Sequence, residues 1–315
     1  MRIILAPMEG LMDYYLRSVI GHFGGCDLVV GEFVRVVDAL LPKSVFLKTI
    51  PEFSAALTDP PIRAQLLGSD PKALASNALR ALELGSCGID LNFGCPSRTV
   101  NNHKGGAILL REPDKIYRII STVKAALPED VCLSAKMRLG YDDTSLAIEN
   151  ALAMEAAGVN EITVHARTKM EGYRPPAHWE WIARINEATS INIIANGDIF
   201  STQDYQRCIE ITGCTDVMIG RGLVYQPDLA LQIKSQLQQC TVTRLEWVRL
   251  AQQIHVFFQS MRGKVPERYI CGRLKQWLKF LATRHEQAGT LFDQLKAVDD
   301  INQVEAALKK MLVIV

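Results

Sequence analysis

Eight short apolar or β-branched runs recur between residues 3 and 219, separated by stretches long enough to hold a helix. The intervening segments, such as 71–84, 113–126, 145–157, 202–211 and 228–238, carry apolar residues at three- and four-residue spacing. Alternation of strand and helix predicts a parallel sheet, and eight repeats predict closure into an α/β fold, the (β/α)8 TIM barrel. The eight predicted strands are Ile3–Ala6, Leu28–Val30, Ala64–Leu67, Ile89–Asn92, Leu133–Met137, Glu161–His165, Asn192–Ala195 and Asp216–Ile219.

The second strand is the least certain part of this pattern, because the run Phe33–Val37 could extend it or form a separate hairpin. An open, doubly wound sheet is the alternative fold. That fold commonly carries a Gly-x-Gly-x-x-Gly motif after its first strand, and no such motif follows here.

After Gln239 the pattern becomes purely helical. Four amphipathic segments are separated by Gly, Pro or Asp-Asp breaks, which predicts a small helical bundle. The predicted helices are Leu245–Ser260, Cys271–Arg284, Gly289–Val298 and Ile301–Leu312. We therefore expect a barrel domain of residues 1–239 followed by a helical domain of residues 240–315.

Composition limits the class of protein. Of the 315 residues, 48% are hydrophobic, yet no apolar run reaches the ~18 residues of a membrane span. We expect a cytoplasmic protein without a membrane partner. The eight cysteines are dispersed and form no Cys-x-x-Cys pair, so neither a disulfide framework nor a metal site is expected.

The net charge of +1 conceals an asymmetry between the two predicted domains. Residues 240–315 hold 12 Lys and Arg against 7 Asp and Glu, whereas residues 1–239 hold 23 against 27. Between Arg262 and Arg284 seven basic residues face a single acidic one, Glu267. Such a local field attracts polyanions, so the helical tail is a candidate nucleic-acid surface.

The stretch Asn92-Phe93-Gly94-Cys95-Pro96-Ser97 begins at the last residue of the fourth predicted strand. It places the Cys95 thiol and the Asn92 amide at a carboxyl end of the barrel, where such folds build their sites. Cys95 considered alone is more simply a small core residue. The other strand ends decide between the two interpretations.

Every other assigned strand end is polar as well, and in a barrel these ends face one pocket. The candidate site residues at these ends, polar or beside a polar residue, are Pro7, Met8 and Glu9 after the first strand, Gln65 in the third, Lys136 and Arg138 in the fifth, His165 in the sixth, Asn196, Gly197 and Asp198 in the seventh, and Gly220 and Arg221 in the eighth.

The last two strand ends, Asn-Gly-Asp and Gly-Arg-Gly, predict a phosphate site, because glycines allow backbone N–H groups to approach an anion. With the phosphate there, the Lys136 ammonium near the pocket centre and the Gln65 amide suit the ring of flavin mononucleotide, FMN. The predicted cofactor is therefore FMN.

The set of motifs resembles the tRNA-dihydrouridine synthases across the whole barrel. The matching motifs are Ala-Pro-Met-Glu-Gly at 6–10, Gln-Leu-Leu-Gly at 65–68, Asp-Leu-Asn-Phe-Gly-Cys-Pro-Ser at 90–97, Gly-Gly-Ala at 105–107, Lys-Met-Arg-Leu-Gly at 136–140, His-Ala-Arg-Thr at 165–168, Asn-Gly-Asp at 196–198 and Gly-Arg-Gly at 220–222. The stretches 32–36 and 273–278 look most like the bacterial C-type members, synthase C.

This resemblance implies a mechanism. Reduced FMN, regenerated by NADPH, would deliver hydride from N5 to C6 of a uracil, and Cys95 would protonate C5. A thiol with an ordinary pKa near ~8.5 is still protonated at neutral pH, as a proton donor must be. Asn92 would bond the uracil edge and Tyr173 could cover the base.

The resemblance also implies a tRNA partner, and uridine 16 of the D-loop as the target by likeness to the C-type members. The target base must leave its stack, which the partly unstacked loops of tRNA make easier. Candidate tRNA contacts are Arg35 and Arg138 at the barrel mouth and Arg273, Lys275, Gln276, Lys279 and Arg284 in the tail. We expect a monomer. Two rivals stay open: an FMN-dependent barrel reductase of a free small molecule, and an RNA-binding protein without chemistry.

Overall fold

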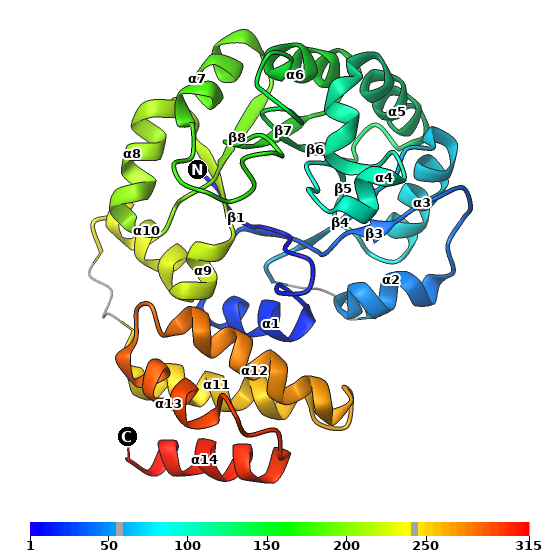
Figure 1. Ribbon diagram of the computed structural model, residues 1–315. Helices are drawn as coiled ribbons and strands as arrows, with labels where there is room; N and C mark the ends of the chain where they lie inside the picture. The colour runs from blue at the N-terminus through cyan, green and yellow to red at the C-terminus, as the bar shows by residue number, and fades with distance from the viewer. Residues whose placement is uncertain (55–58, 241–244, 315) are drawn as a thin grey trace. The chain divides into compact units, whose positions relative to one another are not determined.

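The computed structural model describes residues 1–54, 59–240 and 245–314 (Figure 1). Its strands form one parallel sheet in the order β2-β1-β9-β8-β7-β6-β5-β4-β3, and an additional pairing of β2 with β4 closes it into an eight-stranded barrel. The TIM barrel is thus confirmed. The strands are β1 (Ile3–Leu5), β2 (Leu28–Val30), β3 (Val34–Arg35), β4 (Ile62–Leu67), β5 (Ile89–Phe93), β6 (Leu133–Arg138), β7 (Glu161–His165), β8 (Asn192–Asn196) and β9 (Asp216–Ile219).

Strand β3 resolves the ambiguity of the second predicted strand. It neither extends β2 nor forms a hairpin, but pairs in parallel with the last two residues of β4, Leu66 and Leu67. The run Phe33–Val37 therefore adds a short ninth strand outside the closed barrel.

Helices surround the strands on the outside of the barrel, as Figure 1 shows for α3, α5, α6 and α7. Helix α3 illustrates how the sequence starts a helix: the Asp70 carboxylate accepts a hydrogen bond from the Ala73 amide at 2.7 Å, and Pro71 is the first helical residue. The barrel helices are α2 (Lys43–Thr49), α3 (Pro71–Glu83), α4 (Arg98–Asn102), α5 (Pro113–Ala126), α6 (Ala147–Ala156), α7 (Trp179–Ala188) and α8 (Thr202–Thr212).

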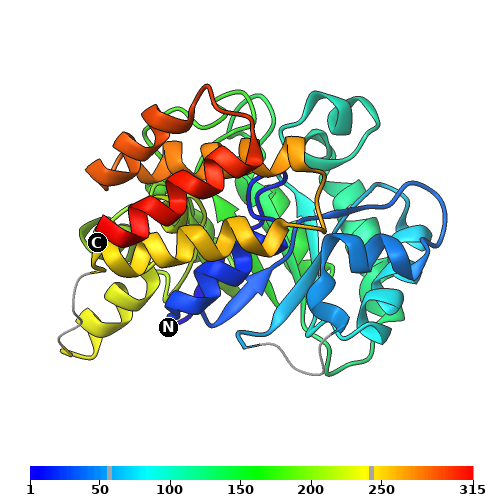
Figure 2. The same ribbon diagram turned by 90° about the horizontal axis from the view of Figure 1, so that it is seen from below.

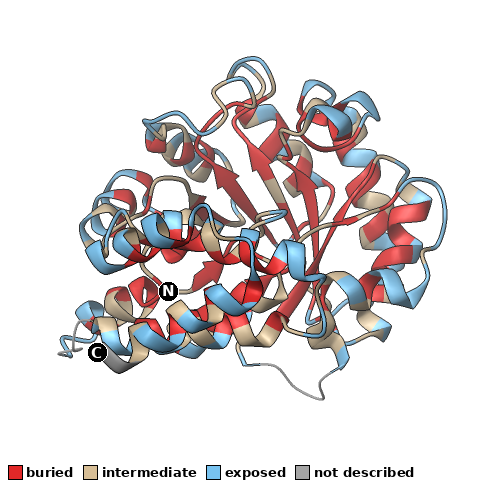
Figure 3. Ribbon diagram, turned by 60° about the horizontal axis from the view of Figure 1, so that its bottom comes forward, coloured by how far each residue is buried: buried red, intermediate tan, exposed pale blue. Residues whose placement is uncertain are grey.

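Burial follows the layers of this fold. The strands are buried almost throughout, whereas the helices expose one face (Figure 3). This matches the near-continuous apolar runs that a parallel sheet covered on both faces requires. One core cluster gathers Ile4 and Ala6 with Leu28 and Val30 of β2, Ile194 of β8 and Met218 of β9.

The chain divides into two compact units. The barrel unit comprises Met1–Tyr14, Cys26–Ile199 and Gln203–Gly220, and the helical unit comprises Tyr15–Gly25, Phe200–Thr202 and Arg221–Val315. Helix α1 (Tyr14–Phe23), which the sequence pattern did not assign, belongs to the helical unit from Tyr15 onward. The same unit contains α9 (Arg221–Tyr225) and α10 (Leu229–Leu237). The domain boundary expected at residues 239/240 stays a prediction, and residues 241–244 beside it lie outside the described part.

The four C-terminal helices expected from the sequence are present. They are α11 (Trp247–Met261), α12 (Glu267–Leu281), α13 (Glu286–Leu295) and α14 (Ile301–Ile314), and α11 packs against both α12 and α14 (Figure 2). The apolar stripe of α12, Leu274, Trp277, Leu278 and Leu281, is buried. Among the described helices, none has the length and apolar character needed to cross a membrane.

Candidate active site

The Cys95 thiol lies in an apolar setting just beyond β5. It clusters with Leu67 and Val100, and Phe33 packs against them; only 7% of the Cys95 surface is exposed. Burial raises the pKa of the Cys95 thiol, and the Glu9 carboxylate acts in the same direction. The thiol is therefore protonated at neutral pH.

A set of hydrogen bonds fixes the backbone around Cys95. The Asn92 Oδ1 accepts from the amides of Gly94 and Cys95, each at 2.9 Å. On the other side, the Asn101 Nδ2 donates to the Cys95 carbonyl at 2.9 Å. Asn101 was not identified from the sequence, although it lies six residues after the thiol in the same motif region. Its side chain joins α4 to the Cys95 loop.

Gly106 allows the next segment to approach this loop. Its φ is +68°, and a Cβ there would lie 2.9 Å from the Cys95 carbonyl oxygen and 3.0 Å from its Cβ. A side chain would therefore collide with the Cys95 backbone. The Gly-Gly-Ala motif at 105–107 thus has a steric reason that its sequence alone did not reveal.

Lys136 lies beside Asn92, since the two residues are register partners on β6 and β5. Its Nζ donates to Asn196 Oδ1 at 3.1 Å, and the Asn196 Nδ2 in turn donates to the Met218 carbonyl at 2.8 Å. Burial and the nearby Arg138 charge lower the pKa of Lys136 to about 8. The hydrogen bond to Asn196 therefore holds the Lys136 ammonium in place, and this group is still charged at neutral pH.

The Lys136 ammonium has hydrogen-bond donors to offer a cofactor such as FMN. Within the described residues, the hydrogen-bond partner of the Lys136 ammonium is the single Asn196 oxygen, and no carboxylate forms an ion pair with it. A lysine ammonium has three N–H donors, so this donor set suits an electron-rich or anionic group. The site residues fit the cofactor.

The backbone after β8 turns sharply toward the carboxyl end of the barrel. Gly197 has a φ of +127°, and a Cβ there would lie 3.3 Å from His165 Cδ2 and 3.2 Å from Ala177 Cβ. Asp198 follows with a φ of +52°, and its carboxylate pairs with the fully buried Arg167. Arg167 neutralises this carboxylate, which would otherwise repel a phosphate. Arg167 was missed as a site residue because the motif His-Ala-Arg-Thr does not reveal its partner.

Two loops meet on the Arg138 side chain. Its Nε donates to the Gly94 carbonyl at 2.8 Å, and its Nη1 donates to the carbonyls of Thr168 at 3.0 Å and Gly172 at 2.9 Å. Arg138 is only 2% exposed. This position makes Arg138 an anchor for the Cys95 loop and for the loop that carries Tyr173, rather than an exposed phosphate ligand. Its contact with tRNA stays a prediction.

Tyr173 is the exposed member of this group. Its ring lies 5.1 Å from the Arg138 guanidinium carbon and 5.9 Å from the His165 ring, while 55% of its surface remains exposed. His165 is buried, and Nε2 lies 3.4 Å from Arg167 Nη1. The tyrosine ring therefore lies near Arg138 and His165, and more than half of its surface is open to solvent.

The amide of Gln65 is fully buried inside the barrel. Its Nε2 donates to Asp90 Oδ2 and its Oε1 accepts from Asn92 Nδ2, both at 2.7 Å. Both ends of this amide thus have protein partners. The expected contact with a flavin ring would use the remaining hydrogen on Nε2, and it stays a prediction.

The loop after β1 holds the remaining barrel candidates, Pro7, Met8 and Glu9. The amides of Leu11 and Met12 both donate to the Met8 carbonyl, at 3.0 and 2.8 Å, so the loop is a compact turn. Gly220 packs against it, because a Cβ there would lie 3.1 Å from Met8 Sδ. Arg221 is the first residue of α9 in the helical unit, where its guanidinium carbon lies 5.4 Å from the Phe200 ring centre.

The basic stretch 262–284 carries less net charge than its sequence suggests. Lys275 forms an ion pair with Asp299 at 2.7 Å, and Arg262 pairs with Glu305. Both acidic partners lie beyond the counted stretch. Counting one acidic residue against seven basic ones therefore overstated the field. Lys279, Gln276 and Arg284 are exposed, and Arg273 donates to Gln276.

The chain is similar to known proteins over almost its whole length. The family model described as dihydrouridine synthase matches residues 4–312. The tRNA-dihydrouridine(16) synthase of Pseudomonas syringae pv. tomato is 47% identical over 311 residues, 98% of each chain. The tRNA-dihydrouridine(16) synthase of Neisseria meningitidis serogroup B is 46% identical over 98% of this chain and 93% of its own.

A solved structure of histamine dehydrogenase from Rhizobium sp. 4-9 shares the fold at 13% identity and a TM-score of 0.59. The likeness covers 82% of this chain and 48% of that larger one. It supports the barrel architecture alone. The family match, by contrast, spans nearly every residue, and on that basis the chain belongs to the dihydrouridine synthase family.

Proposed function

We propose that this protein is a flavin-dependent tRNA-dihydrouridine synthase that reduces uridine 16 of the tRNA D-loop. The proposal is supported by family membership and by relatives named tRNA-dihydrouridine(16) synthase, which are 43–47% identical over almost the whole chain. The resemblance of residues 32–36 and 273–278 to C-type members supports the same assignment. An enzyme that acts on tRNA in bacteria would work in the cytoplasm.

The single observation that carries the chemistry is the buried Cys95 thiol, held in an apolar cluster at the carboxyl end of β5. When bound, FMN reduced by NADPH would supply the hydride for C6 of the uracil. Cys95 would then donate its proton to C5, since burial keeps the thiol in its protonated form. Its apolar neighbours, Leu67 and Val100, form a buried cluster with Cys95.

Different barrel residues would contact different parts of FMN. Gly197, Asp198, Gly220 and Arg221 would surround the phosphate through backbone N–H groups and the guanidinium. Lys136 would lie against the electron-rich end of the ring, aimed there by Asn196. The remaining proposed contacts to FMN come from Pro7, Met8, Glu9, Gln65 and His165.

The enzyme would be a monomer, and the tRNA would contact both of its predicted domains, residues 1–239 and 240–315. Asn92 and Tyr173 would hold and cover the uracil, while Arg35 and Arg138 would lie along its path. In the tail we favour Arg273, Gln276, Lys279 and Arg284 over Lys275, whose ammonium is already paired with Asp299.

The direct test is incubation of the purified protein with FMN, NADPH and an unmodified tRNA transcript, followed by mass mapping of the digested RNA. We expect a gain of two hydrogens confined to uridine 16. Reduction of a free pyrimidine or enone without any gain in tRNA would instead support a small-molecule reductase. If the protein binds tRNA but takes up no flavin, both the synthase and the small-molecule reductase would be refuted.

A further inference from the structure

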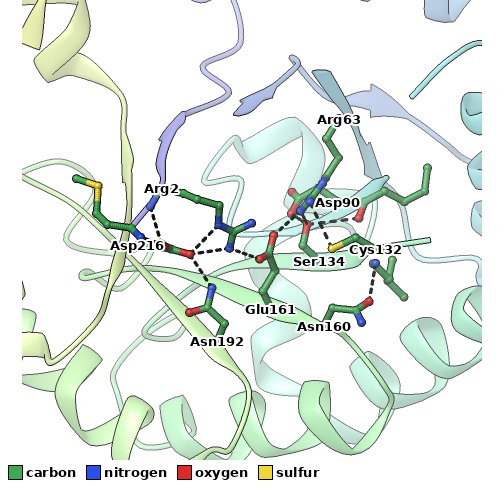
Figure 4. Close-up of polar contacts among 12 residues, drawn as sticks. Arg2, Arg63, Asp90, Cys132, Ser134, Asn160, Glu161, Asn192 and Asp216 are labelled. Carbon is green, nitrogen blue, oxygen red and sulfur yellow. Dashed lines mark hydrogen bonds and ion pairs between the residues drawn. The ribbon is translucent and has the colours of Figure 1, made fainter. Parts of the chain in front are cut away.

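Asp90 is a buried carboxylate of β5 that has no role in the proposed chemistry. Only 1% of its surface is exposed. Its Oδ1 accepts from Ser134 Oγ at 2.5 Å and its Oδ2 accepts from Gln65 Nε2 at 2.7 Å. Arg63 Nη1 donates to the same Ser134 hydroxyl at 2.8 Å (Figure 4). The carboxylate is thus a double acceptor, with its position fixed from two strands.

From Asp90 a chain of hydrogen bonds leads to the Cys95 loop. Gln65 Oε1 accepts from Asn92 Nδ2 at 2.7 Å, and Asn92 Oδ1 accepts from the Cys95 amide at 2.9 Å. Each amide therefore points its nitrogen toward Asp90 and its oxygen toward the loop. An amide reversed at either position would place two donors or two acceptors against each other.

Asp90 fixes this direction because both of its oxygens accept, Oδ1 from Ser134 and Oδ2 from Gln65, although burial raises the pKa of this carboxyl. The Gln65 nitrogen must then face Asp90, so its oxygen faces Asn92. The Asn92 nitrogen faces Gln65 in consequence, which leaves its oxygen for the loop. The direction of the entire chain follows from the group at its inner end.

We propose that Asp90 is a positioning residue that orients Gln65 and Asn92 and thereby holds the Cys95 loop in its reactive place. The proposal rests on the proposed function for its catalytic meaning. Asp90 acts through two amides and touches neither uracil nor cofactor. Loss of its acceptor frees the Gln65 amide to rotate, and the loop amides lose their fixed partner.

Three variants separate orientation from packing. Asp90→Leu keeps the branched frame of the side chain, with larger end groups, but removes the oxygens that accept from Gln65 and Ser134. Asp90→Asn keeps an acceptor, because its Nδ2 can face the Ser134 hydroxyl, which accepts as well as donates. Ser134→Ala removes the other bond to Asp90 and leaves the bond from Gln65 intact.

The test measures alkylation of Cys95 by iodoacetamide in the FMN-loaded protein without tRNA, followed by peptide mass spectrometry at residue 95. We expect Asp90→Leu to accelerate labelling about tenfold, the equivalent of about one hydrogen bond. Asp90→Asn and Ser134→Ala should stay within about twofold of the wild-type rate. If Asp90→Leu does not fold, Gln65→Met replaces it. This change removes the amide between Asp90 and Asn92, and we expect the same, about tenfold faster labelling.

A second measurement addresses catalysis. Single-turnover oxidation of the NADPH-reduced protein by tRNA should slow about tenfold in Asp90→Leu, with the KM for tRNA unchanged and with rescue by Asp90→Asn. Wild-type labelling in Asp90→Leu, or equal acceleration in Asp90→Asn, would overturn the proposal. A wild-type protein that never reduces tRNA would refute the proposed function instead, and the labelling result would still decide the role of Asp90.

Discussion

The two ends of the barrel treat their charges in opposite ways. At the amino-terminal ends of the strands, Arg63 pairs with Glu161 at 2.6 Å, and Arg2 pairs with Glu161 at 2.5 Å and with Asp216 at 2.7 Å (Figure 4). Each cation there has a carboxylate partner. At the carboxyl ends, Lys136 faces an amide and Arg138 faces three carbonyls.

The difference separates stability from chemistry. Charges at the amino-terminal end satisfy one another within the protein, so that end needs no ligand. At the carboxyl end Arg167 pairs with Asp198, but Lys136 and Arg138 have neutral acceptors, so these two cations leave positive charge for an anionic cofactor and substrate. A protonated thiol lies among them. The comparison predicts that substitutions at one end change folding, and substitutions at the other change binding and turnover.

The largest effect is expected at the carboxyl end. Cys95→Ala removes the proposed proton donor, so reduction of tRNA should fall about 10²–10⁴-fold, the range of general acid catalysis. Bound flavin, read from its visible absorbance, and its reduction by NADPH should persist. Cys208→Ala serves as the control, because that thiol is equally buried but belongs to α8. Normal turnover by Cys95→Ala would remove the thiol from the mechanism.

At the amino-terminal end, Glu161→Gln leaves the buried Arg63 without its carboxylate. The free energy of unfolding, measured in urea, should fall by about 3–5 kcal/mol, as expected when a buried pair loses one partner. Turnover per folded molecule should remain. Asp142→Asn is the matched control, since its pair with Arg111 is half-exposed and should contribute less than about 1 kcal/mol. Equal losses in both variants would remove the distinction.

The same pair predicts a pH dependence of stability. Burial alone would raise the pKa of Glu161, but the Arg63 charge and the bonds from Arg2 lower it below 4.5. A carboxyl whose pKa is lower in the folded state stabilises above its unfolded value and loses that contribution as pH falls through the folded value. The difference in unfolding free energy between the wild type and Glu161→Gln should therefore be largest above pH 4.5 and shrink as the pH falls through the lower folded value. Identical acid transitions would argue against the pair.

Lys136→Met tests the charge left over at the carboxyl end. The affinity for FMN, measured by fluorescence quenching, should fall about 10–100-fold, the range for a hydrogen bond to a charged group. Lys72→Met, on the exposed face of α3, should bind FMN as the wild type does. An unchanged affinity in Lys136→Met would leave the ammonium without a cofactor role.

The smallest effect comes from titration of that ammonium. With its pKa at about 8, Lys136 carries a charge below that pH and loses it above. FMN affinity should therefore fall, by no more than about tenfold, as pH rises from about 7 to about 9. In Lys136→Met the same titration should be flat. A fall of equal size in that variant would assign the pH dependence to another group.

Much of the fold could be predicted because each barrel strand is locally apolar. The bounds of β2, β7 and β9 agree with the sequence pattern, and the other five differ by one or two residues. Two of the C-terminal helices lie earlier than expected. Helix α13 begins at Glu286, three residues before the expected start, and α12 begins at Glu267 after Pro266, four residues before it. A helix start depends on the preceding proline, which the apolar spacing does not record.

Partners far apart in sequence could not be predicted. Arg63 and Glu161 are separated by 98 residues, and Lys275 of α12 pairs with Asp299, which lies beyond α13. The sequence identified Cys95, Lys136 and Asn92 through their strand ends. It did not identify Arg167, Asn101 or Asp90, because their importance lies in the groups they contact and not in their own position in a motif.

The most direct test of the contrast between the two ends is a paired measurement on Cys95→Ala and Glu161→Gln. Each FMN-loaded variant is unfolded in urea and, separately, reduced with NADPH and mixed with unmodified tRNA. We predict a crossed result: Cys95→Ala unfolds close to wild type and forms no dihydrouridine, whereas Glu161→Gln unfolds early and still forms it. Loss of both properties in one variant, with retention of both in the other, would contradict the separation of stability from chemistry.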